Sequence, residues 1–263
     1  MPASAEDRAR AAHQLTSEIV YGPTESRRYG RTYGVNILPP AEKLCDWNCT
    51  YCQLGYSQYG DDELGTDAPF RGPSPEAIGA ALEAAEPVPG LAGIVLCGNG
   101  EPTLHPKFPE VIEALRAARD RRFQGVPLIV LTNGAEAWRK RWRAALRSVD
   151  EVAVKLDAGT CELFHRVNLP LRSTCVEHQI RTVKRLEGCV IQSCFVTGKV
   201  DNSTPDAIEA WVGAVARAMP SRVDLYTIAR PTPSGKLLPV TSERLNEIAR
   251  RLEARTGITA RVA

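Results

Sequence analysis

Strand and helix patterns alternate along most of this chain, and the alternation limits the folds that it can adopt. Six apolar or alternating runs of strand length are separated by segments whose apolar residues recur at helical spacing. Parallel strands need long crossover connections, so this order predicts an α/β fold in which helices cover a parallel sheet. A doubly wound sheet and an incomplete barrel both fit, and both bind ligands at the carboxyl ends of their strands. The predicted strands are residues 34–38, 91–97, 126–132, 151–158, 189–197 and 222–228.

Helix signals occupy the intervals between the predicted strands. Ser74 and Thr204, each followed by proline, predict two helix starts, because Ser and Thr cap N-termini and Pro is tolerated in the first turn. Thr174 and Glu177 have the spacing of a capping box and predict a third start. The expected apolar stripes are Ile78 and Leu82; Phe108, Val111, Ile112 and Leu115; Ile208, Trp211, Val212 and Val215; and Leu245, Ile248, Ala249 and Leu252.

These elements fit a single domain. A chain of 263 residues can bury a large core, and we place the core of this domain at about residues 30–230. We expect an N-terminal helical segment over residues 1–20, and a C-terminal helix and strand over residues 240–263. A further helix is expected at 136–147, and Gly257 is expected to end the last helix.

Charge and hydropathy exclude several kinds of partner. The formal net charge of +2 is too small to predict binding to DNA or to an anionic membrane surface. No apolar run reaches the roughly 18 residues of a membrane span. The N-terminal sequence MPASAEDRARAAHQ lacks the apolar region of a secretory signal. We therefore expect a cytoplasmic protein with no membrane partner.

Three cysteines, Cys45, Cys49 and Cys52, follow the first predicted strand with the spacing C-x3-C-x2-C. Thiolates suit zinc, copper(I) and iron–sulfur clusters. Structural zinc sites usually take four ligands, and neither a histidine nor a fourth cysteine lies close by in the sequence. Either a distant cysteine completes a closed site, or the site stays open for a substrate or cofactor.

Polar segments also follow or end other predicted strands. They are GNGEPT at 98–103, TNG at 132–134, KLDAG at 155–159 and TGKVDN at 197–202. Because the carboxyl ends of parallel strands meet at one edge of a sheet or barrel, we expect these segments and the three cysteines to form one site.

Two motifs together resemble the radical S-adenosylmethionine (radical SAM) superfamily. The three-cysteine motif has an aromatic residue, Tyr51, directly before its last cysteine, and it follows the first strand of a chain with six β/α units. The segment GNGEP at 98–102 is similar to that superfamily's glycine- and glutamate-containing motif after the second strand, apart from Asn99. The resemblance spans most of the chain and implies a partial (β/α)6 TIM-type barrel.

The resemblance implies one [4Fe-4S] cluster and S-adenosylmethionine as cofactors. Cys45, Cys49 and Cys52 would bind three irons, and the fourth iron would bind the amino and carboxylate groups of S-adenosylmethionine. An injected electron would cleave S-adenosylmethionine to methionine and a 5′-deoxyadenosyl radical, which would abstract hydrogen from a substrate. A flavodoxin or a ferredoxin would be the external electron donor.

Further residues receive roles through the same resemblance. Tyr51 would lie by the adenine, and Thr197 and Tyr226 occupy places where such enzymes hold the adenine. Asn133 and Asp157 are candidates for contacts to the ribose or the carboxylate. The residues whose backbone would approach the methionine ammonium group are Gly98, Asn99, Gly100, Glu101 and Pro102.

A narrower resemblance points to a group related to the wyosine-forming tRNA enzymes, which build a tricyclic base from a methylguanosine and pyruvate. The similar segments are GPTESRRYGRTYGVNILPP, GNGEPTLHP, LTNG, KLDAG and YTIARPTP. It implies a modified-base precursor in RNA as the substrate. The chain lacks a flavodoxin-like domain and a second cysteine cluster near its N-terminus, so a small-molecule or peptide substrate stays open.

Lys155 and Asp157 are the candidate catalytic pair. In the run EVAVKLDA, Val152, Val154 and Leu156 share one face and the two charged residues share the other. If the apolar face meets the helices, Lys155 points into the barrel, where it could bind a carboxylate or form a Schiff base with a carbonyl. The alternative is a Lys155–Asp157 pair that only lines the lumen.

Two basic segments have two interpretations each. Arg27 and Arg28 could bind an anionic substrate, or they could pair at the surface, where Glu25 is close in sequence. The run RKRWRAALR at 139–147 could contact RNA, but a solvated basic helix face is the more common meaning of such a run.

The remaining cysteines bear on the alternatives. In a reducing compartment they are expected to be ligands or core residues rather than disulfides. Cys97 ends an apolar strand and is expected in the core, while Cys189 and Cys194 should point to opposite faces of a strand. An auxiliary cluster that uses Cys161 or Cys175 stays open. A non-catalytic, metal-stabilised binding or electron-transfer protein is the alternative function, although ferredoxin-like clusters usually take four cysteines.

Overall fold

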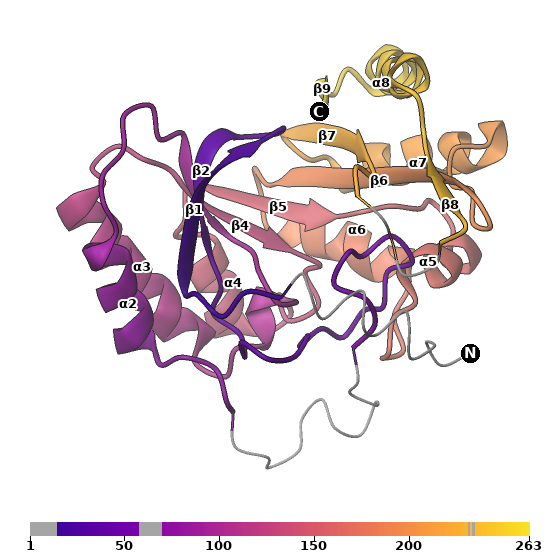
Figure 1. The fold of residues 1–263 in the computed structure, drawn as a ribbon. Coiled ribbons are helices and arrows are strands. Elements are labelled where there is room, and N and C mark those ends of the chain that lie inside the picture. Colours follow the sequence, from indigo (N-terminus) through magenta and orange to yellow (C-terminus); the bar gives the residue numbers. More distant parts are fainter. Residues whose placement is uncertain (1–14, 58–69, 231, 233–234) are drawn as a thin grey trace.

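An open, curled sheet forms the centre of the molecule, with helices packed along its outer side (Figure 1). The computed structural model describes residues 15–57, 70–230, 232 and 235–263. The strands follow one another across the sheet in the order β1-β2-β3-β4-β5-β6-β7-β9, and β8 pairs with β6. This arrangement confirms the predicted α/β fold and its partial-barrel form.

Six strands in chain order form the parallel part of the sheet, as the sequence predicts. They are β2 (Gly30–Val35), β3 (Gly93–Leu96), β4 (Leu128–Thr132), β5 (Glu151–Lys155), β6 (Val190–Gly198) and β7 (Arg222–Thr227). The C-terminal strand β9 (Ala260–Val262) extends the sheet beyond β7 and confirms the predicted tail strand. Two antiparallel strands complete it: β1 (Val20–Ser26) pairs with β2, and β8 (Leu237–Pro239) pairs with the end of β6.

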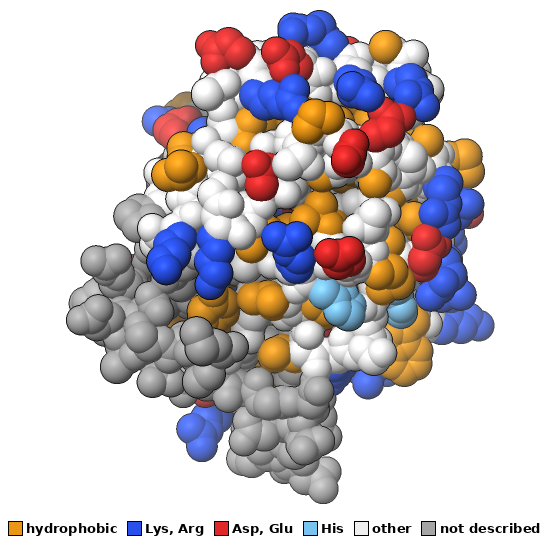
Figure 2. Space-filling view, turned by 90° about the vertical axis from the view of Figure 1, so that its right-hand side faces the viewer, with side chains coloured by type: hydrophobic (Ala, Val, Ile, Leu, Met, Phe, Trp, Pro, Cys, Tyr) orange, Lys and Arg blue, Asp and Glu red, His pale blue; other side chains and the backbone are white. Residues whose placement is uncertain are grey.

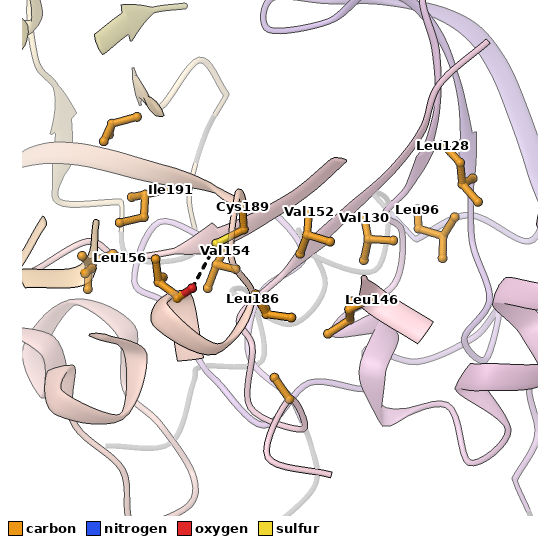
Figure 3. Close-up of a cluster of buried hydrophobic side chains, with 14 of the residues drawn as sticks. Leu96, Leu128, Val130, Leu146, Val152, Val154, Leu156, Leu186, Cys189 and Ile191 are labelled. Carbon is orange, nitrogen blue, oxygen red and sulfur yellow. Dashed lines mark hydrogen bonds between the residues drawn. The ribbon is translucent and has the colours of Figure 1, made fainter. Parts of the chain in front are cut away.

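Crossover helices connect the parallel strands and cover the outer face of the sheet. They are α2 (Pro75–Ala84), α3 (Phe108–Arg122), α4 (Lys140–Leu146), α5 (Cys161–Asn168), α6 (Val176–Arg185) and α7 (Pro205–Ala218), with α8 (Ser242–Thr256) after β8 and a short 3-10 helix, η1 (Pro102–Leu104). Figure 3 shows how Val152, Val154 and Leu156 of the β5 region line up with Val130 of β4 and with Leu186 in one apolar layer. The predicted face of β5 is therefore the one that packs on the helices.

Local sequence signals account for several helix ends. Ser74 and Thr204 cap α2 and α7, and their hydroxyl groups accept hydrogen bonds from Ala77 N and Ala207 N. Gly257 ends α8 with a φ of 71°, a left-handed conformation that glycine adopts without steric cost. The predicted apolar stripes of α3, α7 and α8 are buried.

Other elements differ from the expectation. Strand β1 was not predicted, because it is a mostly exposed edge strand without an alternating apolar pattern. The first parallel strand ends at Val35, since the side chain of Asn36 turns to bind the loop at residues 97–99. Helix α4 starts at Lys140, four residues after the predicted start, and α5 was not predicted.

Two predicted helix signals are corrected. Thr174 does not cap α6: the N-cap is Cys175, whose side chain makes no capping hydrogen bond. Residues 1–14 of the expected N-terminal helical segment lie outside the described residues. Residues 15–18 have no regular secondary structure, and β1 begins at Val20.

Candidate functional site

The three-cysteine loop is joined directly to the segment at 98–102. Leu44 forms an isolated parallel bridge with Gly100. Leu44 N donates to Asn99 O at 2.9 Å, and Glu101 N donates to Leu44 O at 2.9 Å. The first cysteine follows Leu44 immediately, so the backbone of the second motif fixes where the cysteine loop begins.

A second anchor holds the other side of the cysteine loop. Asn48 N donates to Leu169 O at 3.0 Å, and Thr50 N donates to Val167 O at 2.8 Å. Trp47, which is 2% exposed, packs edge-on against Phe164 of α5. The cysteine loop and α5 therefore pack together. Helix α5 is part of the site, although its sequence did not indicate this role.

Lys43 is a buried cation beside the cysteines, and the sequence interpretation missed it. Its ammonium group donates to Gly55 O at 2.7 Å and to Trp47 O at 3.3 Å, so it spans the loop. Burial alone would lower the pKa of Lys43, but the charges of Cys52, Cys45 and Cys49 outweigh burial and raise it. Lys43 therefore keeps a positive charge next to the thiol groups.

The cysteines have the chemistry of a polynuclear site. All three are partly exposed. Burial raises the pKa of Cys45 and raises that of Cys49 to about 11, so these thiols would release protons when they bind metal. Among the described residues, no three His, Cys, Asp or Glu side chains converge at the spacing of a single metal ion. Thiolate donors suit an iron–sulfur cluster, in which each cysteine binds a different iron.

Glycine is required at two positions of the segment 98–102. A Cβ atom on Gly100, which has a φ of 148°, would lie 1.8 Å from Leu44 O. A Cβ atom on Gly98, which has a φ of 149°, would lie 2.6 Å from Asn36 Oδ1. Both positions combine a close approach with a backbone conformation that other residues avoid. The glycines thereby let the second motif pack against the cysteine loop.

The side chains of this segment point into the protein. Asn99 binds Pro39 O and Thr16 O, both at 2.9 Å, and Pro102 is buried at the start of η1. Glu101 accepts from Thr103 N at 3.0 Å and, through its other oxygen, from Asn133 N at 2.7 Å. The side chains of this segment therefore hold the surrounding loops in place.

Asn133 links this segment to the cysteine loop. Its amide group donates to Asp46 Oδ1 at 2.6 Å, one residue after Cys45, and its own backbone N–H binds Glu101. Burial raises the pKa of Glu101 to about 7, against the hydrogen bonds that it accepts. Asn133 thus lies at the predicted edge of the sheet, with its side chain engaged by Asp46.

Asp157 is the centre of a buried hydrogen-bond network beside Cys49. One of its oxygens accepts from Tyr51 OH and from Asn168 Nδ2, the latter at 2.6 Å. The other accepts from Cys194 N at 2.7 Å and from Lys155 Nζ at 2.8 Å. Asn168 Nδ2 also lies 3.4 Å from Cys49 Sγ, so the network reaches the cysteine loop.

Lys155 continues the network along the inner face, by which we mean the face of the sheet that carries Lys155, Asp157, Gln192, Cys194 and Tyr226. Its ammonium group donates to Tyr226 OH at 2.8 Å. Burial would lower the pKa of Lys155, but the carboxylate of Asp157 outweighs burial and raises it. Lys155 is therefore a cation paired with Asp157.

The structure sorts the predicted site residues into connected groups. Cys49, Tyr51, Asp157, Lys155 and Tyr226 are linked through hydrogen bonds, with Asn168 as a bridge. A second group joins Cys45, through Leu44 and Asp46, to the segment 98–102 and Asn133. Thr197, at the end of β6, stands apart and donates to Asp201 at 2.9 Å. Asn168 has the buried oxygen Oδ1 without a hydrogen-bond partner in the described part of the chain, which is an acceptor available to a ligand.

The other cysteines require two corrections. Cys161 and Cys175 form a disulfide, with Cα atoms 5.0 Å apart, where ligands or core residues were expected. The reason is that α5 begins at Cys161 and the chain folds back so that Cys175 caps α6 beside it. Cys97 is partly exposed, not a core residue, and its Sγ lies 3.1 Å from Tyr21 OH. Cys189 and Cys194 belong to different apolar clusters, as their opposite faces predict.

Comparison with known proteins identifies the class. The model of the Radical SAM superfamily matches residues 43–227, which is more than half of the chain, so the chain belongs to that superfamily. A Helicobacter pylori (strain ATCC 700392 / 26695) UPF0026 protein is 30% identical over 223 residues, which cover 81% of this chain and 67% of that protein. A Brachyspira hyodysenteriae protein named GTPase Obg is 25% identical over 249 residues, which cover 93% of this chain and 35% of that protein. The chain thus spans about a third of the length of the latter relative.

Solved structures share the fold. A radical SAM methyltransferase from Sphaerobacter thermophilus superposes with a TM-score of 0.62 at 19% identity, covering 88% of this chain and 65% of that chain. The structure of TYW1 with a lysine-pyruvate adduct bound has a TM-score of 0.58 at 14% identity, covering 86% of this chain and 74% of that chain. At these identities the likeness concerns the fold. In the described part of this chain, no helix is both long and apolar enough to cross a bilayer.

Proposed function

We propose that this chain cleaves S-adenosylmethionine reductively and abstracts hydrogen from a substrate held on the inner face of its sheet. Radical SAM enzymes use a [4Fe-4S] cluster and S-adenosylmethionine, and this chain is an enzyme of that type. The observation that carries the proposal is the bridge between Leu44 and Gly100, which joins the cysteine loop to the backbone of residues 98–102. The two motifs would otherwise be separate elements of sequence.

The residues present fit both cofactors. Cys45, Cys49 and Cys52 would hold three irons, and the backbone of residues 98–102 would receive the methionine end of S-adenosylmethionine. When bound, the cluster supplies the electron that cleaves S-adenosylmethionine to the 5′-deoxyadenosyl radical, which abstracts hydrogen from the substrate. Lys43 supplies a buried positive charge beside the thiolates, and it lowers the electrostatic cost of placing negative charge there.

The inner-face residues have distinct tasks in this proposal. Tyr51 and Asn168 hold the Asp157 carboxylate, which would orient the ribose or the substrate. The ammonium group of Lys155 neutralises the Asp157 carboxylate. Lys155 and Tyr226 together form a polar wall of the inner face beside Asp157. Binding energy from such a fixed polar wall orients the reacting groups and keeps water from the radical.

A small molecule or a peptide is the substrate class that we favour, since the side chains of Lys155 and Asp157 are only 12% and 0% exposed. On the face shown in Figure 2, acidic and basic side chains are interspersed, which offers little support for extended contact with RNA there. A modified-base precursor in RNA is the second candidate. It is favoured by the basic helix α4, where Arg139 lies 4.7 Å from the ring of Trp142 and Trp138 is 56% exposed. RNA binding that weakens steeply with salt would support this second candidate.

The proposed electron donor is a flavodoxin or a ferredoxin, because the chain needs one electron for each cleavage of S-adenosylmethionine. Dithionite can replace that donor in a direct test. The protein is reconstituted anaerobically with iron and sulfide, mixed with dithionite and S-adenosylmethionine, and assayed for 5′-deoxyadenosine.

We expect product from the wild type and none from Cys49→Ala, with Cys189→Ala as the matched control because Cys189 lies in the apolar core. The control should bind as much iron as the wild type. A wild type that binds four irons and S-adenosylmethionine but forms no 5′-deoxyadenosine would contradict the proposal. Stable retention of zinc in place of iron and sulfide would support the non-catalytic alternative.

A further inference from the structure

The turn between β1 and β2 carries three residues across the inner face of the sheet. Arg27 donates to Thr227 O at 3.0 Å, at the end of β7. Arg28 donates to Gln192 Oε1 of β6, and Tyr29 OH donates to Glu151 at 2.8 Å at the start of β5. The turn therefore places the guanidinium group of Arg28 against the same wall that carries Lys155.

The acidic side chains of the inner face already form ion pairs with basic side chains. Asp157 pairs with Lys155 at 2.8 Å. Glu151 pairs with Arg222 at 2.8 Å, and Asp224 pairs with Arg222 and with Arg261. Because these pairs neutralise one another, they leave no acidic partner for Arg28.

Arg28 has neutral neighbours instead. Within the described residues it forms a hydrogen bond to Gln192 and no ion pair, and its guanidinium group lies 4.7 Å from the ring of Tyr226. Burial raises the pKa values of Cys97 and Cys194, so both are uncharged thiols near neutral pH. Arg28 therefore carries a positive charge on the inner face that no acidic side chain of the described residues pairs with.

Gln192 is built to orient this cation without neutralising it. Its amide Nε2 donates to Ala153 O at 3.1 Å, which aims its oxygen at Arg28, and the residue is 3% exposed. A glutamate at this place would form an ion pair with Arg28. The neutral glutamine fixes the guanidinium group while leaving most of its five N–H donors available.

The position of Arg28 relative to the cofactor residues is set by strand register. Lys155 is opposite Gln192, and Cys194 is opposite Tyr226. The hydroxyl of Tyr226 accepts from Lys155 while its ring contacts Arg28, so this tyrosine separates the two cations. A group bound by Arg28 would therefore lie on the inner face at a greater distance from Cys49 than Asp157 does.

We propose that Arg28 binds a carboxylate of the substrate, with Gln192 as the residue that positions it. A planar guanidinium group binds a carboxylate through two parallel hydrogen bonds, and the single uncompensated charge matches a monoanion better than a phosphate dianion. The proposal rests on the proposed function, because it names the class of compound on which that site acts: a small molecule or a peptide with a carboxylate.

The test uses the reconstituted holoenzyme with S-adenosylmethionine and three probes: 3-phenylpropionate, its amide 3-phenylpropionamide, and inorganic phosphate. Affinities are measured by ligand-observed NMR. For the wild type we expect the carboxylate to bind roughly tenfold or more tightly than the amide, as a charge-assisted pair of hydrogen bonds implies. Arg28→Gln should abolish that difference, and Arg28→Lys should restore part of it.

Arg27→Gln is the matched control, because Arg27 lies in the same turn but is exposed and bonds to a backbone carbonyl. It should keep the wild-type preference within about twofold. Thermal unfolding of Arg28→Gln should match that of the wild type, which separates loss of binding from loss of folding.

Three results would overturn the proposal: equal binding of carboxylate and amide by the wild type, an undiminished preference in Arg28→Gln, or tighter binding of phosphate than of carboxylate. A wild type that prefers the carboxylate but does not cleave S-adenosylmethionine would support the anion site and contradict the proposed function. The two proposals therefore fail in distinguishable ways.

Discussion

The two faces of β5 carry alternate residues and serve opposite purposes. On the outer face, Val152 and Val154 pack against helices in an apolar layer. On the inner face, Lys155 and the following Asp157 form an ion pair inside a network of hydrogen bonds. The outer face stabilises the fold through burial, which depends mainly on area, whereas the inner face depends on direction and distance.

This difference predicts that substitutions on the two faces will affect stability and function separately. Outer-face changes should alter the free energy of unfolding and leave the cofactor chemistry intact in the folded fraction. Inner-face changes can be made neutral in charge and size, yet they should still remove function, because no apolar replacement can reproduce the hydrogen bonds.

The largest effect is expected at Trp211 on the outer face. It is 1% exposed, and its Nε1 donates to Leu156 O at 3.0 Å and to Ser193 Oγ at 3.1 Å. Trp211→Ala should lower the free energy of unfolding by about 3–5 kcal/mol, because it opens a cavity and removes a buried donor. Urea unfolding at constant temperature measures the loss.

Trp138→Ala is the matched control, since Trp138 is 56% exposed. It should change the free energy of unfolding by less than about 0.5 kcal/mol. A loss at Trp138 comparable to that at Trp211 would mean that the outer face is not the main source of stability.

On the inner face, Asp157→Asn should lower the free energy of unfolding by about 3 kcal/mol, because it leaves the Lys155 ammonium group without its carboxylate. The double variant Lys155→Met/Asp157→Asn removes both charges and should recover much of that loss. Formation of 5′-deoxyadenosine should stay impaired in both. This outcome would separate the stability of the inner face from its function.

Glu209→Gln serves as the control for charge removal, because Glu209 forms exposed ion pairs with Arg251 and Arg255. It should leave the free energy of unfolding close to that of the wild type, because exposed ion pairs contribute little to stability. Full recovery of cofactor cleavage in the double variant would show instead that Asp157 acts only as the partner of Lys155.

Sequence patterns predict the strand order and the two faces well, because both depend on local periodicity. The alternation in EVAVKLDA assigns Lys155 and Asp157 to one face, and the described contacts agree. The cysteine spacing and GNGEP locate the carboxyl ends of two strands, and the Leu44–Gly100 bridge joins them.

The residues that sequence reasoning missed are placed by contacts far apart in the chain. Asn168 reaches Cys49 and Asp157 only because α5 packs against the cysteine loop, and α5 is only eight residues long. Lys43 is adjacent to the cysteine motif, but only the fold of the loop buries its ammonium group. Arg28 is already a candidate anion-binding residue from its sequence, and the turn after β1 places it against Gln192 of β6.

The smallest effect is expected at Glu101, which lies in the loop that follows β3. Its pKa is raised by burial from 4.5 to about 7. Between these values the folded protein binds more protons than the unfolded chain, so stability falls as pH rises through that window. From pH 5 to pH 7 the metal-free protein should lose about 2 kcal/mol of unfolding free energy relative to Glu101→Gln, which cannot ionise. Above about pH 8, where Glu101 is ionised in both the folded and the unfolded state, the two unfolding curves should run parallel. Urea unfolding of both proteins across pH 5–8 measures this difference. The opposite result would be a wild type that gains stability relative to Glu101→Gln as the pH rises. It would show that the four donors around Glu101 outweigh burial and stabilise its carboxylate. This edge of the sheet would then stabilise a negative charge as the inner face does.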